Sequence, residues 1–161
     1  VLINSYLMWG EKCVEKFTGM FSFIIVNLTD TSVFAARDHL GIKPLYYAKI
    51  EGTLFFVSEI KSLLILNDLS LNKNKILEQI AYRYIPGKET IFNEVERLMP
   101  GSYIKFKQDG KVLHNTYYDV TKSIDDSHKN EIDSNCNYPK IESLLNQSII
   151  EHTRSDVGYN V

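Results

Sequence analysis

The sequence has few of the residues from which small independent sites are built. Only two cysteines occur among 161 residues, Cys13 and Cys136, and they share no Cys-x-x-Cys spacing. The four histidines form no His-x-x-x-His pair, so we expect no metal site. Because unpaired cysteines are typical of reducing compartments, we expect a cytoplasmic protein with two inert thiols.

Long apolar runs and an excess of positive charge are also absent. No apolar stretch reaches the roughly 18 residues of a membrane span, the longest candidate being residues 20–26. The 18 basic and 20 acidic residues give a net charge of -2. We therefore expect neither a membrane protein nor a nucleic-acid-binding one. Hydrophobic residues make up 44% of the chain, which is enough for an ordinary domain core.

Motifs for autonomous catalysis are missing as well. The chain has no phosphate loop and no Gly-x-Ser-x-Gly elbow. Ser58-Glu59-Ile60-Lys61 matches the Ser-x-x-Lys signature of penicillin-recognising enzymes, but the other two signatures of that chemistry are absent. A helix N-cap is the favoured role for Ser58. We expect no complete catalytic centre in this chain, and His39 is interpreted as a loop residue.

Apolar periodicity predicts an α+β fold. Helices are expected at the start of the chain up to Gly10, over 12–17, after Ser58, around 76–84, and from 141 to about 154. Strands are expected over 20–26, 32–37, 44–50, 53–58, 102–107 and 111–117. The wholly apolar segment 20–26 predicts a central strand covered on both faces. Glu51-Gly52 and Gln108-Asp109-Gly110 are typical of hairpin turns.

Composition predicts three parts. Residues 1–120 form the strand-rich part, residues 121–137 are polar and acidic enough for a solvated linker, and residues 138–161 begin a second domain with an amphipathic helix. Val1 is not an initiator Met, and residues 157–161 resemble the start of a strand. We therefore expect the chain to be a fragment of a longer enzyme, with marginal stability or a tendency to aggregate when isolated.

The stretch 36–47, Ala-Arg-Asp-His-Leu-Gly-Ile-Lys-Pro-Leu-Tyr-Tyr, joins two expected strands through a charged loop. Gly41 permits a positive φ, and Pro44 fixes the entry into the next strand. Arg37 and Asp38 could form a buried, hydrogen-bonded pair that holds the loop. The structural role is the first interpretation, and a loop facing a ligand path or a domain interface is the second.

This stretch, together with residues 56–64 (Phe-Val-Ser-Glu-Ile-Lys-Ser-Leu-Leu), resembles the glutamine-hydrolysing asparagine synthetases. Further blocks follow the order found in that family. They are Phe17-Thr18-Gly19-Met20-Phe21-Ser22-Phe23, Tyr84-Ile85-Pro86-Gly87 with Thr90-Ile91-Phe92, Leu98-Met99-Pro100-Gly101-Ser102-Tyr103, and Arg154-Ser155-Asp156-Val157. The resemblance covers nearly the whole chain outside the expected linker.

The resemblance implies a specific architecture and reaction. Residues 1–120 would be the C-terminal part of a class II glutaminase domain, an N-terminal-nucleophile αββα sandwich. Residues 138–161 would start an α/β ATP-pyrophosphatase domain with its first helix. In this family the glutaminase releases ammonia from glutamine, and the second domain uses ATP and Mg²⁺ to convert aspartate into an aspartyl-adenylate that ammonia attacks. A homodimer is compatible with the resemblance.

The family's catalytic groups would lie outside this sequence. Its leading Cys-Gly-Ile, its glutamine-binding residues and its Asn-Gly-Glu would precede Val1, and its ATP loop would follow Val161. We therefore expect no catalytic, substrate-binding or metal-binding residue here, no bound cofactor, and no activity of this chain alone. The positions expected near the boundary between the two domains are Arg37, Asp38, Gly41, Lys43, Ser58, Glu59 and Lys61.

Two alternatives remain open at this stage. The parent protein could be an amidotransferase of the same family that acts on a carboxylate other than aspartate, because acceptor choice would lie outside this sequence. Alternatively, the chain could be a non-catalytic binding or scaffold domain that shares the fold. Flanking sequence with a Met-Cys-Gly start and a Ser-Gly-Gly-x-Asp-Ser loop would separate the enzyme from the scaffold.

Overall fold

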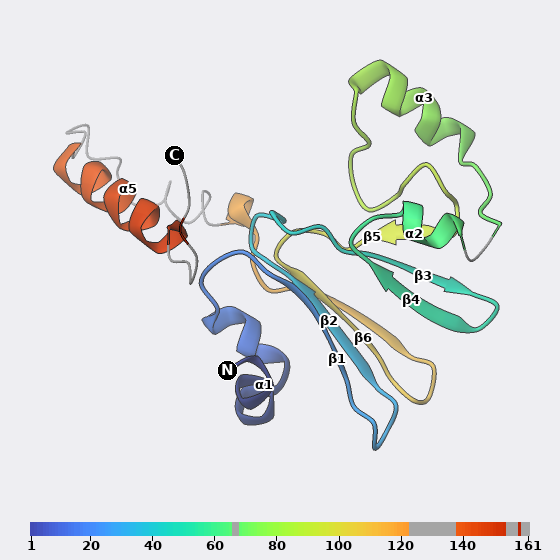
Figure 1. The fold of residues 1–161 in the computed structure, drawn as a ribbon, viewed down its shortest axis with the longest axis horizontal. Coiled ribbons are helices and arrows are strands. Elements are labelled where there is room, and N and C mark those ends of the chain that lie inside the picture. Colours follow the sequence, from blue (N-terminus) through green and yellow to red (C-terminus); the bar gives the residue numbers. More distant parts are fainter. Residues whose placement is uncertain (66–67, 123–137, 154–157, 159–161) are drawn as a thin grey trace. The chain divides into compact units, whose positions relative to one another are not determined.

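The computed structural model describes residues 1–65, 68–122, 138–153 and 158. The chain divides into two compact units, Val1–Asp119 and Val120–Val161. The first unit contains the two β-sheets discussed below, and the second contains the helix α5 (Tyr138–His152) (Figure 1). The helix α5 agrees with the periodicity of its sequence. The linker predicted over 121–137 lies, from residue 123 onward, outside the described residues.

The first sheet is antiparallel, with the strand order β1-β2-β6-β7. Its strands are β1 (Ser22–Val26), β2 (Val33–Arg37), β6 (Ser102–Phe106) and β7 (Val112–Thr116). The predicted second strand and the hairpin around Gly110 are confirmed. The register sets Ile24 opposite Ala35 and Ala35 opposite Ile104.

The prediction that residues 20–26 form a central strand covered on both faces was wrong for the described chain. The strand β1 lies at the edge of its sheet and pairs with β2. Ile24 and Val26 are 41% and 54% exposed, whereas Phe23 and Ile25 pack against the core. An apolar run indicates a strand, but it does not indicate whether the strand pairs with one neighbouring strand or with two.

The second sheet is also antiparallel, with the order β4-β3-β5. It consists of β3 (Tyr46–Ile50), β4 (Thr53–Val57) and β5 (Val95–Arg97). Glu51 and Gly52 have φ angles of 50° and 83°, which is typical of a tight hairpin turn with two left-handed residues. The predicted hairpin is confirmed. The strand β5 was not predicted, because three residues are too few to show a period of two.

The two sheets pack against each other through one hydrophobic cluster. It joins residues of the first sheet to residues of the second and of the loops beside them: Ala35, Leu45, Tyr47, Leu98 and Ile104. The opposite face of the first sheet, with Phe34 and Ala36, is covered by the 3-10 helix η1 (Gly10–Lys16) and by α1 (Leu2–Trp9). The short helix α2 (Lys61–Leu64) inserts Leu63 against the other face of the second sheet. The result is a mixed α/β fold with antiparallel sheets.

Helix boundaries show where local signals succeeded and failed. The helix α1 ends at Gly10, whose φ is 57°, as predicted. The prediction that Ser58 caps a helix was wrong, because α2 begins at Lys61 after Ile60 and has no side-chain cap. Ser58 is exposed and follows β4 directly, so the chain still has to turn before the helix can begin.

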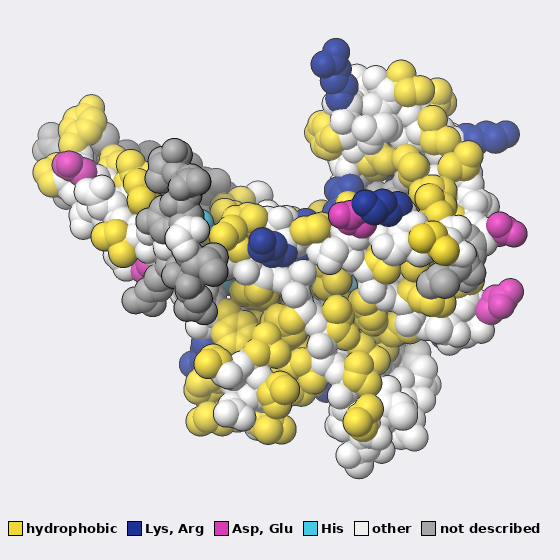
Figure 2. Space-filling view, in the orientation of Figure 1, with side chains coloured by type: hydrophobic (Ala, Val, Ile, Leu, Met, Phe, Trp, Pro, Cys, Tyr) yellow, Lys and Arg dark blue, Asp and Glu magenta, His cyan; other side chains and the backbone are white. Residues whose placement is uncertain are grey.

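The helix α3 (Lys73–Tyr82) lies between β4 and β5 in the sequence. The side chain of Asn72 caps it by accepting the N–H of Lys75 at 3.3 Å. Its surface is partly apolar, with Leu77 64% and Ile80 73% exposed, and Figure 2 shows hydrophobic side chains over this helix. No described helix has the length and apolar character required to cross a bilayer.

Candidate functional site in the loop between β2 and β3

The loop that follows β2 is built around the carboxylate of Asp38. This side chain is 1% exposed and lies directly after the strand. Its oxygens accept backbone N–H groups from Phe21 at 3.2 Å, Leu40 at 3.2 Å, Ile42 at 2.9 Å and Lys43 at 2.9 Å. The anion therefore fixes the path of the loop through bonds that require no other side chain.

The ionisation of Asp38 reflects these bonds. Burial alone would raise the pKa of its carboxyl, but the N–H groups of Lys43, Ile42, Phe21 and Leu40 outweigh burial and hold that pKa below its ordinary value. Each of these donors stabilises the charged form. Asp38 is thus an anion at neutral pH, and its charge is part of the loop's structure.

Arg37, the last residue of β2, binds the same loop through three carbonyl groups. Its Nε donates to the carbonyl of Lys43 at 2.7 Å, and its Nη2 donates to that of Gly41 at 2.6 Å. Its Nη1 donates to the carbonyl of Leu98 at 2.7 Å. Arg37, which is 8% exposed, therefore links the loop to a segment that is 61 residues distant in sequence.

Arg37 and Asp38 were predicted to form a buried pair with each other, and the structure shows a different arrangement. Both side chains are buried and hydrogen-bonded, as expected, but in the described chain no ion pair joins them. Each side chain bonds to backbone groups instead. Because successive side chains at a strand end point to opposite faces, each of the two reaches a different part of the backbone.

Two glycines allow the loop and the segment after β5 to approach closely. Gly41 has a φ of +68°, and a Cβ there would lie 2.7 Å from Cγ of Pro100 and 3.0 Å from Cζ of Arg37. Gly101 has a φ of +59° and donates its N–H to the carbonyl of Asp38 at 2.8 Å. The positive φ expected at Gly41 is confirmed, and both positions require glycine on steric grounds.

Aromatic rings complete the cluster. The hydroxyl of Tyr117 donates to the carbonyl of Arg37 at 2.6 Å. The ring of His39 packs edge-on against Tyr117 and Tyr118, with centroid distances of 5.3 and 4.8 Å. His39 is a loop residue, as predicted. Tyr117 and Gly101 were not among the predicted site residues, although the Pro-Gly dipeptide at 100–101 signals the turn that brings Gly101 in.

Four of the seven predicted positions come together in this cluster. Arg37, Asp38 and Gly41 contribute as described above, and Lys43 contributes its backbone while its side chain is exposed. Of the other three, Ser58 and Glu59 lie between β4 and α2, and Lys61 is the first residue of α2. Glu59 and Lys61 form an exposed ion pair, and this pairing raises the pKa of Lys61. Such a pair contributes little to stability.

The described residues bring no nucleophile or metal ligands into the cluster. Cys13 is fully buried in η1, and burial raises the pKa of its thiol, which disfavours a reactive thiolate. Cys136 lies outside the described residues. No group of three His, Cys, Asp or Glu side chains in the described ranges is placed to hold a metal ion. The cluster can therefore position backbone, and it contains no set of groups for bond cleavage.

Comparison with known families gives the class of the protein. The sequence profile of the glutamine amidotransferase domain matches residues 1–118. This match covers the unit with two antiparallel sheets and includes the whole Arg37–Asp38 cluster. The chain belongs to the glutamine amidotransferase domain family.

Individual proteins that are similar to the chain include asparagine synthetases and an amidase. The chain is 30% identical over 158 residues to asparagine synthetase [glutamine-hydrolyzing] 1 of Bacillus subtilis, covering 98% of this chain and 24% of the relative. It is 29% identical over 165 residues to asparagine synthetase [glutamine-hydrolyzing] 3 of the same organism, covering 98% and 25%. It is also 28% identical over 120 residues to amidase chyE of Penicillium rubens, covering 74% and 18%. The chain thus spans about a quarter or less of these relatives.

Proposed function

We propose that this chain is part of a cytoplasmic, glutamine-dependent asparagine synthetase. Residues 1–120 would form the C-terminal part of its N-terminal-nucleophile glutaminase sandwich, and residues 138–161 would begin its synthetase domain. The supporting observation is the match to two asparagine synthetases over 98% of the chain, beyond the glutamine amidotransferase match to residues 1–118.

In the proposed reaction, glutamine hydrolysis gives glutamate and ammonia, and ammonia attacks an aspartyl-adenylate made from aspartate and ATP. Asparagine, AMP and pyrophosphate are the other products. The described residues do not form a cluster that fits Mg²⁺, and no phosphate loop occurs in the sequence. We propose that ATP and Mg²⁺ bind to other parts of the protein, and we assign no chemical step to residues of this chain.

The role proposed for this chain is to hold a boundary between the two domains. Arg37 fixes the loop 38–43 and ties it to Leu98 through three short hydrogen bonds. A guanidinium held in this way can maintain the shape of a passage at a domain boundary. We propose that Arg37 shapes the passage through which ammonia reaches the second domain, with Asp38, Gly41 and Lys43 fixing the same loop. We propose that Ser58, Glu59 and Lys61 face that boundary as well.

Product analysis of the complete protein tests the function. Given glutamine, aspartate and ATP, it should form asparagine and glutamate in a fixed ratio, together with AMP and pyrophosphate. Release of glutamate without asparagine would reject the asparagine synthetase. Arg37→Lys and Arg37→Ala should lower the asparagine formed per glutamine hydrolysed, whereas Arg83→Ala, at an exposed position, should not. Unchanged coupling in both Arg37 variants would reject the role in the passage.

A second acceptor is the alternative, because one matched relative is not named an asparagine synthetase. The relative from Penicillium rubens is named an amidase and matches 74% of this chain. The parent protein would then transfer ammonia to a carboxylate other than that of aspartate. The same assay with a panel of carboxylic acids distinguishes the two, because the preferred acid alone should raise the consumption of ATP.

A further inference from the structure

A surface cavity of about 450 Å³ lies beside the Arg37 cluster within the first unit. Its walls come from the loop after β2, from the segment after α3 and from the turn after β5. Two arginines line it, Arg37 and Arg97, together with Tyr46 from β3. The volume is in the range of pockets that hold small organic molecules.

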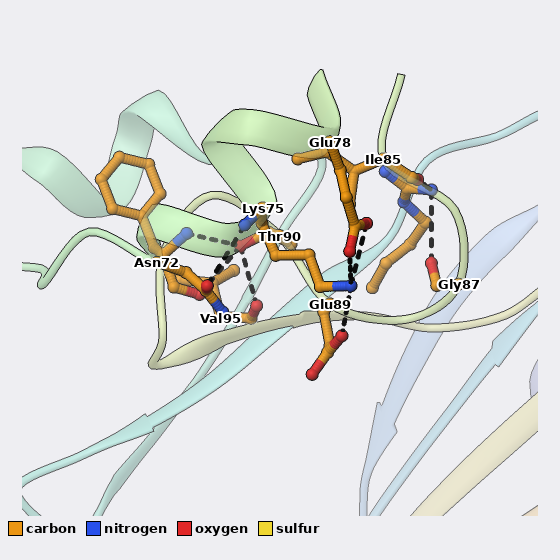
Figure 3. A network of polar contacts seen from close by, with 10 residues as sticks. Asn72, Lys75, Glu78, Ile85, Gly87, Glu89, Thr90 and Val95 are labelled. Atoms are coloured by element: carbon orange, nitrogen blue, oxygen red, sulfur yellow. Dashed lines mark hydrogen bonds and ion pairs between the residues drawn. The ribbon is translucent and has the colours of Figure 1, made fainter. Parts of the chain in front are cut away.

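The wall after α3 is held in place by polar contacts. Lys75 of α3 forms ion pairs with Glu78 at 2.8 Å and Glu89 at 2.7 Å, and Figure 3 shows its ammonium between the two carboxylates. The hydroxyl of Thr90 donates to the carbonyl of Val95 at 2.9 Å, also drawn in Figure 3. The pair between Lys75 and Glu89 connects α3 with the segment that leads into β5, and it therefore joins the two sides of the wall at residues 84–87.

Arg97, the last residue of β5, presents a guanidinium that is only partly used. Its Nη1 donates to the carbonyls of Ile85 at 3.2 Å and Gly87 at 3.4 Å. Its Cζ lies 5.8 Å from the ring centroid of Tyr46. Among the described residues, Nε and Nη2 of Arg97 have no hydrogen-bond acceptor. One edge of a planar donor fork is thus available to a ligand.

The charges around the cavity are unbalanced. None of the described residues that line it is acidic, and in the described ranges neither Arg37 nor Arg97 forms an ion pair. Glu96 points away to Tyr47 and Lys88, and the Asp38 carboxylate binds backbone N–H groups. Burial, followed by the nearby Arg97, lowers the pKa of Arg37, and the charge of Asp38 partly offsets them. Two cations in a partly dry cavity favour an anion.

We propose that this cavity binds the carboxylate of a small organic acid. The free edge of the Arg97 guanidinium would receive the carboxylate, because planar N–H pairs match its two oxygens, and the buried Arg37 would add a second positive charge. Leu40, Pro86 and Met99 supply apolar surface for the carbon chain of the acid. The ligand would tie the segment 84–87 to the loop 38–43. The binding of such an acid does not depend on the proposed function.

Titration of arginine side chains by nuclear magnetic resonance tests the proposal. The chain has four arginines, so their Nε–Hε signals can be assigned by substitution. In the full 161-residue chain, at a concentration where scattering shows monomers, glutamate at constant ionic strength should shift the signals of Arg97 and Arg37 saturably. Arg83 should not respond. Acetate should give the same response more weakly, and acetamide, which has no carboxylate, should give none.

Variants locate the binding. Arg97→Gln should weaken binding roughly tenfold or more, measured at the Arg37 signal, because the bidentate contact is lost. Arg83→Gln is the matched control and should bind as the unmodified chain does. If Arg97→Gln does not fold, the titration of the unmodified chain with glutamate still tests whether the cavity binds a carboxylate. Non-saturating shifts, equal shifts with acetamide or chloride, or unchanged affinity in Arg97→Gln would overturn the site. Tighter binding of inorganic phosphate than of glutamate would overturn the choice of a carboxylate.

Discussion

Arg37 and Asp38 are adjacent in the sequence, and both hold the loop after β2 by bonding to its backbone. The carboxylate of Asp38 accepts four N–H groups, and the guanidinium of Arg37 donates to three carbonyls. One residue therefore satisfies the donors of the loop and the other its acceptors. Buried backbone groups need such partners, so the loop can remain irregular and still be stable.

Shortening the fork of Arg37 should destabilise the first unit. We expect Arg37→Lys to lower the free energy of unfolding by about 3 kcal/mol, because one ammonium cannot replace three directed N–H groups and leaves buried carbonyls without donors. Urea unfolding measures the loss. Arg83→Lys, at an exposed position, should change stability by less than about 0.5 kcal/mol. Equal stability of Arg37→Lys and the unmodified chain would contradict the described bonding.

Neutralising Asp38 should have an effect that depends on pH. Since the pKa of Asp38 in the folded chain is held below its ordinary value, its charge contributes stability above the unfolded pKa of about 3.9. That contribution is lost as the pH falls through the folded pKa. We expect Asp38→Asn to cost about 2 kcal/mol at pH 7, and the difference between the two proteins to shrink below about pH 4. A difference that stays constant down to pH 3 would count against the charged carboxylate.

A methyl group at Gly101 should be far more harmful than one at another glycine with positive φ. A Cβ at Gly101 would lie 2.3 Å from the carbonyl oxygen of Tyr118, whereas nothing lies within 4 Å of one at Gly110. We expect Gly101→Ala to cost at least about 3 kcal/mol and Gly110→Ala about 1 to 2 kcal/mol, the latter from left-handed backbone alone. Thermal and urea unfolding of both variants provide the comparison, and similar losses would contradict the close approach.

The exposed edge of β1 should make the isolated chain associate as its concentration rises. Ile24 and Val26 are on this edge strand and are 41% and 54% exposed, and such edges pair readily with other chains. We expect Ile24→Lys to reduce light scattering without lowering the unfolding midpoint. Leu28→Lys, in the turn after β1 and 89% exposed, adds the same charge elsewhere. An equal reduction by both variants would assign the effect to net charge and contradict the role of the edge.

Local chemistry accounts for the parts of the fold that were predicted. Glu51-Gly52 and Asp109-Gly110 set two hairpins, because the positive φ angles of Glu51, Gly52 and Gly110 suit tight turns between paired strands. Gly10 ends α1 because its positive φ of 57° takes the chain out of the helix, a conformation that glycine adopts readily. The site was also partly predictable from local sequence. Arg37, Asp38 and Gly41 lie within a few residues of one another and form hydrogen bonds within a single short loop.

Long-range contacts account for what could not be predicted. Arg97 carries no local signal, and its position depends on β5 pairing with β3, some 50 residues earlier. The same applies to the edge position of β1 and to the bond between Arg37 and Leu98. The Ser58 prediction failed because an N-cap signal does not say how many residues the chain needs to leave a strand.

The sequence by itself determined every described strand except β5, the two hairpin turns, the absence of the catalytic motifs searched for and the resemblance to one family, because each depends on neighbouring residues or on their order. The tertiary structure decided which strands are neighbours, that Arg37 and Asp38 bond to the backbone, and that Arg37 and Arg97 share a cavity. Those features depend on contacts between segments that are far apart in the chain. Such contacts stabilise the fold, but no local pattern in the sequence indicates which segments will meet.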